Sequence, residues 1–288
     1  MRVRRQLSMS EYTRISIRPL SGSLGAEIGG AYIGEGMDAE TVAEVRRALL
    51  QFNVVFLRDQ HITSAQYLDF AHQFGEVSEY PFLTGLPDYP DITAVVKLED
   101  ETVNFGGIWH TDTSYLETPP MGTMLLAREL PPVGGDTIFA NGYQAYDALS
   151  DGMKGLLGGL VAVASSAKAD VSKTREDSIR GAGRDQRADE YLAEHPVVRT
   201  HPETDRKSLY VNPAHTLRFK DMTEEESAPL LQYLYQHQVR PEFTCRFSWG
   251  VGSLAFWDNR CTLHNPVNDY HGHRRVMHRI TLKGDKPA

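Results

Sequence analysis

Residues 243–257 contain two short apolar runs, Phe243-Thr-Cys-Arg-Phe-Ser-Trp249 and Ser253-Leu-Ala-Phe-Trp257, with a glycine-containing turn between them. Each run has the length and the aromatic content of a β-strand. Similar strand-like runs occur elsewhere with Pro/Gly turns between them, at Met121–Ala127, Thr137–Ala140, Ser208–Val211 and Val276–Leu282. Because these strands do not alternate with helices, they favour an antiparallel sandwich or barrel with peripheral helices. The sequence therefore predicts a mostly β fold.

Helix signals are few, and they lie mainly in the first third of the chain. Asp38 is a predicted N-cap before apolar residues at helical spacing, and Thr63 opens a second predicted helix. Further on, one helical stretch is expected over about Tyr143–Leu160, and another begins at Thr223, where Glu226 completes a capping box. These helices are expected to lie outside the β core.

Composition limits the class of protein. The 288 residues are 41% hydrophobic and 24% charged, with a net charge of −8, which is typical of a globular chain and unlike a nucleic-acid-binding protein. No apolar run approaches the roughly 20 residues of a membrane span, so no membrane role is expected. Cys245 and Cys261 are predicted to be buried thiols, and the basic start lacks a secretory h-region, so a cytoplasmic location is expected.

We expect one domain over residues 14–288, preceded by a disordered N-terminal extension over residues 1–13. Within the domain, residues 164–194 turn polar and charged, with the runs Lys173-Thr-Arg-Glu-Asp177 and Arg180-Gly-Ala-Gly-Arg184. So long a polar insertion in a compact domain is either a mobile lid or a disordered segment.

The pair His110 and Asp112 is the first candidate for chemistry. If the two lie on a strand, residues i and i+2 share a face, so one nitrogen and one oxygen can meet at a point. A distant histidine such as His264 would complete a two-His-one-carboxylate set, which suits non-haem Fe(II) because three coordination positions stay open. Spacing alone leaves a rival pair open in His201-Pro-Glu203.

Arg275 and Arg279 are the second candidate. If residues from His273 onward form a strand, both guanidinium groups lie on one face. On an inward face each would need an anion, since buried charges persist only when paired, and arginine is well shaped for a carboxylate or sulfonate. The alternative is a solvated basic strand that faces outward.

The chain resembles the taurine/2,4-D dioxygenase family of Fe(II)- and 2-oxoglutarate-dependent oxygenases along nearly its whole length. The similarity is carried by blocks in the family's order: Val54-Val-Phe-Leu-Arg-Asp-Gln60, Phe74-Gly-Glu76, Trp109-His-Thr-Asp112, Glu117-Thr-Pro-Pro120, Gly134-Gly-Asp-Thr137, His195-Pro-Val-Val-Arg-Thr-His-Pro202, Leu209-Tyr-Val-Asn212, Trp257-Asp-Asn-Arg260 and His273-Arg-Arg-Val-Met-His-Arg279.

This resemblance implies a double-stranded β-helix, which is a cupin-like jelly roll, and a set of residue roles. Fe(II) would be bound by His110, Asp112 and His264. The co-substrate 2-oxoglutarate, used with O₂ and released as succinate and CO₂, would have its distal carboxylate held by Arg275 and Thr137. The acidic head of the prime substrate would be bound by Arg279. Members are often dimers or tetramers, so a homo-oligomer is expected.

Two departures bear on the substrate. Members that act on taurine have a His-Pro-x-Tyr block where this chain has Tyr80-Pro81-Phe82-Leu83, and a Phe where it places His215. We expect Tyr80, Phe82, Leu83 and His215 to line the substrate pocket, although the first three are alternatively ordinary core residues. With Arg279 kept, the prediction is a small anion less polar than taurine, of the aryloxyalkanoate, alkyl sulfate or sulfonate type. Hydroxylation of such a substrate often leads to C–O or C–S cleavage.

Two other functions use the same residues. A zinc-dependent hydrolase can hold its metal on the same three ligands and activate a water. It would leave Arg275 and Thr137 without a role. A non-catalytic jelly-roll binding module is the third possibility, and an intact ligand set with both arginines disfavours it.

Overall fold

The structure is a computed structural model that describes residues 12–78, 80, 83–168 and 191–288. Within these ranges, the helices are α1 (Ala39–Phe52), α2 (Ser64–His72), α3 (Gly142–Asp147), α4 (Asp151–Leu157) and α6 (Glu224–Gln238), with short 3-10 turns η2 (Ile33–Glu35) and η3 (Pro241–Phe243). The predicted caps Asp38, Thr63 and Thr223 are confirmed, because each side chain accepts a hydrogen bond from the backbone N–H three residues on. None of these helices combines the length and the apolar character that a membrane crossing requires.

The predicted β class is confirmed. The larger sheet of the described chain has the order β1-β2-β3-β14-β6-β16-β4, and β5 also pairs with β16. Its strands are β1 (Ser16–Pro19), β2 (Ala26–Gly29), β3 (Val54–Leu57), β4 (Val77–Ser78), β5 (Thr93–Lys97), β6 (Gly122–Glu129), β14 (Leu254–Asp258) and β16 (Arg275–Leu282). All of these pairs are antiparallel except β2 with β3.

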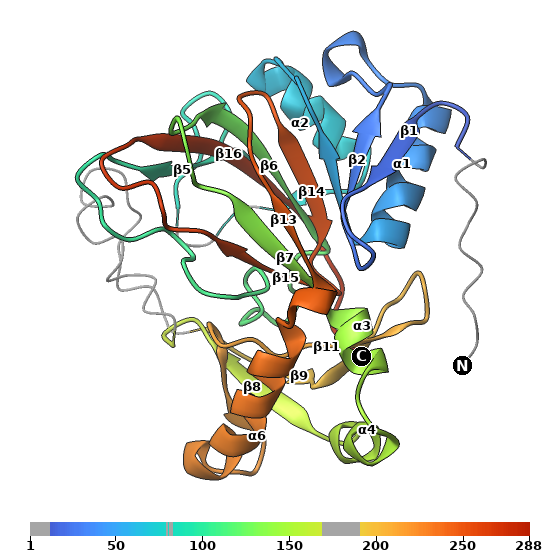
Figure 1. Ribbon diagram of the computed structural model, residues 1–288, viewed down its shortest axis with the longest axis vertical. Coiled ribbons are helices and arrows are strands. Elements are labelled where there is room, and N and C mark those ends of the chain that lie inside the picture. The colour runs from blue at the N-terminus through green and yellow to red at the C-terminus, as the bar shows by residue number, and fades with distance from the viewer. Residues whose placement is uncertain (1–11, 79, 81–82, 169–190) are drawn as a thin grey trace.

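A smaller antiparallel sheet packs on the inner face of the larger one, and the two form the jelly-roll core (Figure 1). Its order is β13-β7-β15, from Thr244–Phe247, Thr137–Asn141 and Thr262–Pro266. Phe56 of β3 stacks on Phe247 of β13 with ring centres 3.9 Å apart, and it meets Phe139 of β7 edge-on at 5.6 Å. Both predicted cysteines are buried and unpaired, Cys245 within this inner core.

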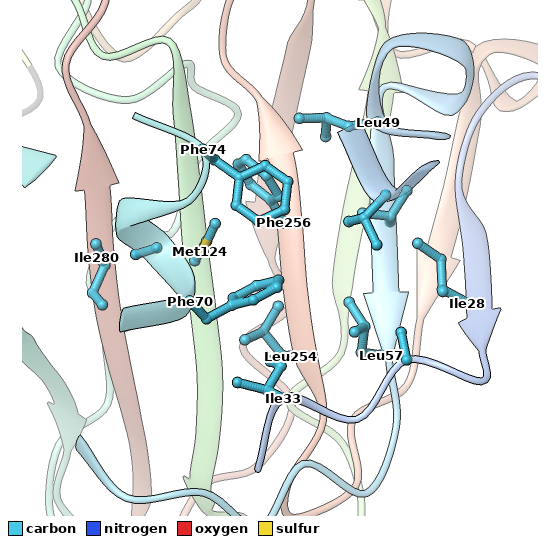
Figure 2. Packing of buried hydrophobic residues seen from close by; sticks show 14 of the residues in the cluster. Ile28, Ile33, Leu49, Leu57, Phe70, Phe74, Met124, Leu254, Phe256 and Ile280 are labelled. Atoms are coloured by element: carbon cyan, nitrogen blue, oxygen red, sulfur yellow. The ribbon is translucent and has the colours of Figure 1, made fainter. Parts of the chain in front are cut away.

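The outer face of the larger sheet is covered by α1 and α2 (Figures 1 and 2). On β3, Val55 and Leu57 join this outer core while Val54 and Phe56 join the inner one, which is the two-residue alternation of a strand. Phe70 and Phe74, near the C-terminal end of α2, pack with Phe256 of β14, as Figure 2 shows. Because both faces of the central strands are apolar, this sheet has a fixed position from which to hold a site.

A second unit consists of the β12-β8-β9 sheet, the β10-β11 pair and the helices α3, α4 and α6 (Figure 1). Its strands are β8 (Val161–Ser165), β9 (Leu192–Pro196), β10 (Val198–Thr200), β11 (Lys207–Leu209) and β12 (Thr216–Phe219). The single helical stretch predicted over Tyr143–Leu160 is wrong: it is two helices, because Ser150 caps a new helix start by accepting from the Met153 N–H.

Two boundary predictions need correction. The predicted extension included Tyr12 and Thr13, but the Tyr12 hydroxyl donates to Gln51 and the Thr13 N–H donates to Glu44, each at 2.8 Å. The predicted lid included residues 164–165 and 192–194, which are paired strand residues of β8 and β9. The predicted extension up to residue 11, lid residues 169–190 and Phe82 lie outside the described residues, as do residues 79 and 81.

Candidate metal and co-substrate site

His110, Asp112 and His264 lie together inside the core. A short antiparallel bridge joins His110 to His264 of β15, with N–H···O distances of 3.0 and 2.8 Å in the two directions. Asp112 follows two residues later, and its Oδ1 lies 3.7 Å from His110 Nε2. One nitrogen or oxygen from each of the three side chains lies within 4.8 Å of the others, and all three residues are buried. The fold thus brings the three predicted ligands to one point.

Hydrogen bonds orient two of these side chains. The Nδ1–H of His110 donates to the carbonyl oxygen of Ile108 at 2.7 Å, which leaves Nε2 as its free nitrogen. The Thr123 hydroxyl donates to Asp112 Oδ2 at 2.7 Å, and Asn259 Nδ2 donates to the same hydroxyl at 2.8 Å. The Trp257 indole N–H holds the Asn259 amide at 2.9 Å. Sequence reasoning missed Thr123 and Asn259, although Asn259 lies in the quoted block Trp257-Asp-Asn-Arg260.

The charges of the cluster suit a cation. Burial alone would raise the pKa of Asp112, but Arg279 and the two histidines outweigh it and hold that pKa well below its usual value. Burial lowers the pKa of His264 to about 3, aided by His110, and it also lowers the pKa of His110. The site therefore offers one carboxylate and two neutral imidazoles near pH 7.

The donor set fits a divalent transition metal. Imidazole and carboxylate ligands bind Fe, Zn and related ions, whereas Mg²⁺ and Ca²⁺ prefer oxygen alone. His264 Nδ1 is buried and has no hydrogen-bond partner among the described residues. Three protein ligands leave part of a metal's coordination shell open for small molecules.

The rival pair His201 and Glu203 lies elsewhere, in a buried ion network. His201 Nε2 lies 2.9 Å from Asp258 Oδ2, while its Nδ1 accepts from the Glu203 N–H at 3.1 Å. Arg260 binds both Asp258 oxygens at 2.7 and 2.8 Å and Glu203 at 2.8 Å. Cys261 lies close to His201 and Asp258, but burial raises the pKa of its thiol to about 12. With its atoms already partnered, this network is a structural one.

Arg275 lines a small inner cavity beside the metal cluster. The cavity has a volume of about 50 Å³, and its described lining includes His264, Asp112, Thr137, Arg275 and Arg279. Arg275 is 6% exposed, and neither its Nε nor its Nη2 has a hydrogen-bond partner among the described residues. Burial lowers the pKa of Arg275, an effect opposed by Tyr270 and Asp136.

The chain approaches Arg275 closely at one glycine. At Gly135, φ is +73° and a Cβ would lie 3.4 Å from the Arg275 side chain, so glycine fits both the turn and the space. Thr137, two residues on, is buried, and its hydroxyl accepts from the Trp249 indole N–H at 3.1 Å. The hydroxyl proton of Thr137 is thereby left for another acceptor.

Arg279 lies on the same face of β16 as Arg275, next to the metal cluster and at the edge of an outer pocket. Both arginines are buried, so the outward-facing alternative is wrong. Arg279 Nη2 lies 3.7 Å from Asp112 Oδ1, and its guanidinium carbon lies 4.3 Å from the centre of the Tyr80 ring. Its Nε and Nη2 lack hydrogen-bond partners within the described ranges.

The outer pocket has a volume of about 140 Å³ and is mainly apolar. Its described lining comprises Tyr80, Val103, Asn104, Phe105, Gly106, Gly107, Ile108, His110, Asp112, Thr113, Tyr115, Ala214, His215 and Arg279. Two predicted substrate residues, Tyr80 and His215, are in this lining, whereas Leu83 is not. Sequence reasoning missed Tyr115 and the segment from Val103 to Ile108, because only the fold carries these residues to the metal cluster.

His215 lies deep in this pocket against an aromatic neighbour. Its ring meets Tyr115 edge-on with centres 4.8 Å apart, and burial lowers its pKa to about 3, aided by His110. His215 is therefore neutral near pH 7. Arg279 is the one cationic side chain in the described lining.

The chain is similar to known proteins over nearly its whole length. Residues 16–281 match the family model described as "Taurine catabolism dioxygenase TauD, TfdA family". An alkylsulfatase from Acinetobacter baylyi is 33% identical, over 94% of this chain and 86% of that protein. An alpha-ketoglutarate-dependent sulfate ester dioxygenase from Pseudomonas putida is 32% identical, over 95% of this chain and 91% of that protein. A crystal structure of a taurine dioxygenase from Burkholderia xenovorans is 34% identical with a TM-score of 0.80, covering 96% of this chain and 91% of that one.

Proposed function

Since this chain belongs to the taurine catabolism dioxygenase TauD/TfdA family, as an Fe(II)- and 2-oxoglutarate-dependent dioxygenase, we propose that His110, Asp112 and His264 are its iron ligands. The proposal rests on one observation above all. His110 and Asp112 line two neighbouring cavities, of which Arg275 lines the inner one and Arg279 lines both; in each guanidinium the Nε and Nη2 lack hydrogen-bond partners among the described residues. Two anions bound beside a metal would supply the missing acceptors.

The inner cavity is assigned to 2-oxoglutarate. Arg275 would hold the distal carboxylate, with its Nε and Nη2 as donors, and Thr137 would add a third donor because its oxygen already accepts from Trp249. Gly135 keeps the space beside Arg275 open. When bound at the cluster, Fe(II) supplies the chemistry by which O₂ converts 2-oxoglutarate to succinate and CO₂ and hydroxylates the prime substrate.

The outer pocket is assigned to the prime substrate, with its anionic group on Arg279. Apart from the proposed ligand Asp112, the described lining has no acidic side chain to meet an ammonium group such as that of taurine. Its aromatic and aliphatic wall suits an apolar body instead. An anchored anion also holds the target C–H near the metal, and small misplacements there cost large factors in rate.

We propose that the preferred substrate is a sulfate ester with an apolar body. The names of two relatives refer to alkyl sulfates or sulfate esters, and the lining of the outer pocket is mainly apolar. Hydroxylation of the carbon that bears the ester oxygen gives an unstable product, which separates into an aldehyde or ketone, sulfate and a proton. Aryloxyalkanoates and sulfonates are the other members of the proposed class. A cytoplasmic location and a dimer or tetramer stay predictions.

The test is a substrate screen that reads succinate, oxygen uptake and sulfate together. A medium-chain alkyl sulfate, an aryloxyalkanoate, an alkyl sulfonate and taurine are each supplied with Fe(II) and 2-oxoglutarate. We expect succinate and sulfate to form in equal amounts with the alkyl sulfate, and taurine to give little above the uncoupled background. Sulfate release without oxygen or 2-oxoglutarate would instead support the hydrolase, and no succinate with any acid would refute the proposed class.

A further inference from the structure

Lys97, the last residue of β5, is a buried lysine beside the proposed co-substrate subsite. It is 4% exposed and pairs in register with Arg275 of β16, so the two side chains lie on the same face of adjacent strands. Two residues before it on that face, Val95 lines the inner cavity that holds Arg275. Lys97 therefore lies on the inward face of the barrel.

The ammonium group of Lys97 has an aromatic neighbour but no anion. Its Nζ is buried without a hydrogen-bond partner among the described residues, and it lies 4.5 Å from the centre of the Tyr270 ring. The guanidinium carbon of Arg275 lies 5.9 Å from the centre of the same ring. Tyr270, itself 4% exposed, thus contacts both cations.

Three carboxylates lie near this group: Asp136 and Asp269 are engaged by Arg246, and Glu101, whose charge acts on Tyr270, accepts from the Leu98 N–H at 2.6 Å. Arg246 Nε donates to Asp136 at 2.6 Å, and its Nη2 lies 3.5 Å from Asp269. Asp269 also accepts from the Gly135 N–H at 2.7 Å. The protein thus brings two buried cations together and leaves neither with a direct ion pair within the described chain.

This arrangement is unfavourable unless an anion binds. Like charges opposite each other on neighbouring strands repel, and a buried charge without a partner is costly. A carboxylate bound on Arg275 would offset both costs. We propose that Lys97 is a positioning residue for the distal carboxylate of 2-oxoglutarate, acting through Tyr270 and Arg275.

This inference rests on the proposed function of the inner cavity. Lys97 contributes to binding of the distal carboxylate in two ways. Its positive charge raises the electrostatic potential at the Arg275 subsite. Its cation–π contact also fixes the Tyr270 ring, which packs near Arg275. Lys97 is in the described lining of neither cavity, but its register partner Arg275 lines the inner one, whereas the described lining of the outer pocket includes neither Arg275 nor Tyr270.

The experiment compares two oxoacids that differ only in the distal carboxylate. Binding of 2-oxoglutarate and of 2-oxopentanoate to Mn(II)-loaded protein is measured by calorimetry for wild type, Lys97→Met and the charge-preserving Lys97→Arg. We expect Lys97→Met to weaken 2-oxoglutarate binding about tenfold, as for one charge acting across about 12 Å at an effective dielectric near 20. Binding of 2-oxopentanoate should change less than about twofold, and Lys97→Arg should recover most of the loss.

Kinetics give a second readout. With Lys97→Met, the KM for 2-oxoglutarate should rise while kcat and the KM for the prime substrate stay near wild type. Equal weakening of both oxoacids would show a merely structural role, and unchanged 2-oxoglutarate binding would show no role; either result overturns the inference. If Lys97→Met does not fold by circular dichroism, Lys97→Gln replaces it.

The control for the assigned cavity is the wild-type protein itself. A clear preference for 2-oxoglutarate over 2-oxopentanoate supports the proposed inner subsite independently of Lys97. If wild type shows no such preference, the proposed function of this cavity fails, and the inference about Lys97 fails with it.

Discussion

Asp112 shows how single residues prepare the proposed metal site. Its Oδ2 is held by Thr123, and the positive charge of Arg279 lies 3.7 Å from its Oδ1. Burial would favour the protonated acid, but these neighbours keep its pKa low, so the carboxylate is ready to bind a cation. Thr123 is in turn held by Asn259, so the orientation of one ligand depends on residues from β6 and from the turn after β14.

Thr123→Val tests this support. Valine is nearly isosteric but cannot donate to Asp112, so the carboxylate loses its fixed orientation. Losing such an outer contact typically weakens metal binding about 10- to 100-fold, and we expect that range for Mn(II), measured by titration of the metal-free protein. Thr123→Ser keeps the hydroxyl and serves as the control. Equal affinities for the valine variant and wild type would argue against the role.

Arg275→Ala and Arg279→Ala separate the two anion subsites. A charged hydrogen bond contributes about 1.5–3 kcal/mol, which corresponds to roughly 10- to 150-fold in affinity. We expect Arg275→Ala to raise mainly the KM for 2-oxoglutarate and Arg279→Ala to raise mainly the KM for the prime substrate. Steady-state kinetics with each substrate varied in turn checks this. Each variant is the other's control, and a shared, unselective loss would contradict the assignment.

At the scale of the element, β16 carries two different surfaces. Its inward face presents Arg275 and Arg279 to the cavities, while His278 on the outward face accepts a hydrogen bond from Arg128 Nε at 3.2 Å. Burial, together with the charge of the neighbouring Arg128, lowers the pKa of His278 to about 4. One strand therefore combines two arginines that line the cavities with a packing contact that requires a neutral imidazole.

The pH dependence of stability follows from that lowered pKa. Between about pH 6.5 and 4 the unfolded chain binds a proton at His278 that the folded chain does not, so the free energy of unfolding falls as the pH falls through this range. We expect His278 to account for about 1–2 kcal/mol of that loss after solvent screening.

Urea unfolding of wild type and His278→Gln at pH 7, 6 and 5 measures the contribution of this residue. Glutamine can accept from Arg128 but does not titrate, so its stability should depend less on pH than that of wild type. Parallel curves for the two proteins would assign the acid sensitivity to other groups.

At the scale of the whole molecule, the network around Asp258 links the two units of the fold. Asp258 ends β14 of the larger sheet, while His201 and Glu203 lie between β10 and β11 of the second unit. Arg46 of α1 also binds Glu203, with its Nη2 at 2.9 Å. Burial alone would raise the pKa of Asp258, but Arg260 and His201 hold it well below its usual value.

Asp258→Asn should therefore destabilise the whole protein. The change leaves Arg260 buried with one remaining carboxylate, and breaking a buried pair in this way costs about 3–5 kcal/mol. Urea unfolding at pH 7 measures the loss. Glu76→Gln, which removes an exposed pair with Lys283, is the matched control and should cost no more than about 1 kcal/mol. Similar small losses for both variants would contradict a structural role for the network.

Local pattern sufficed for the class of the fold and for much of the site. Alternating apolar runs gave most core strands, caps gave the helix starts at Asp38, Thr63 and Thr223, and the quoted family blocks contained the three candidate ligands and both arginines. These features are readable because each depends on residues close in sequence. The strands β4, β5, β8, β9, β10, β12 and β15 were not identified. Several of them, such as Thr262–Pro266 and Leu192–Pro196, contain polar residues or proline and become strands only through their partners.

What the sequence by itself determined is therefore the kind of molecule and its chemical groups: a mostly β oxygenase with two histidines, an aspartate and two arginines that share one face of a strand, whose inward direction the structure decided. Only the tertiary structure decided which distant groups meet. Backbone pairing of His110 with His264, the Thr123–Asn259 support of Asp112 and the placement of Lys97 opposite Arg275 all depend on strand register. Register is fixed when many side chains are buried together, and no single local stretch of sequence determines that collective energy.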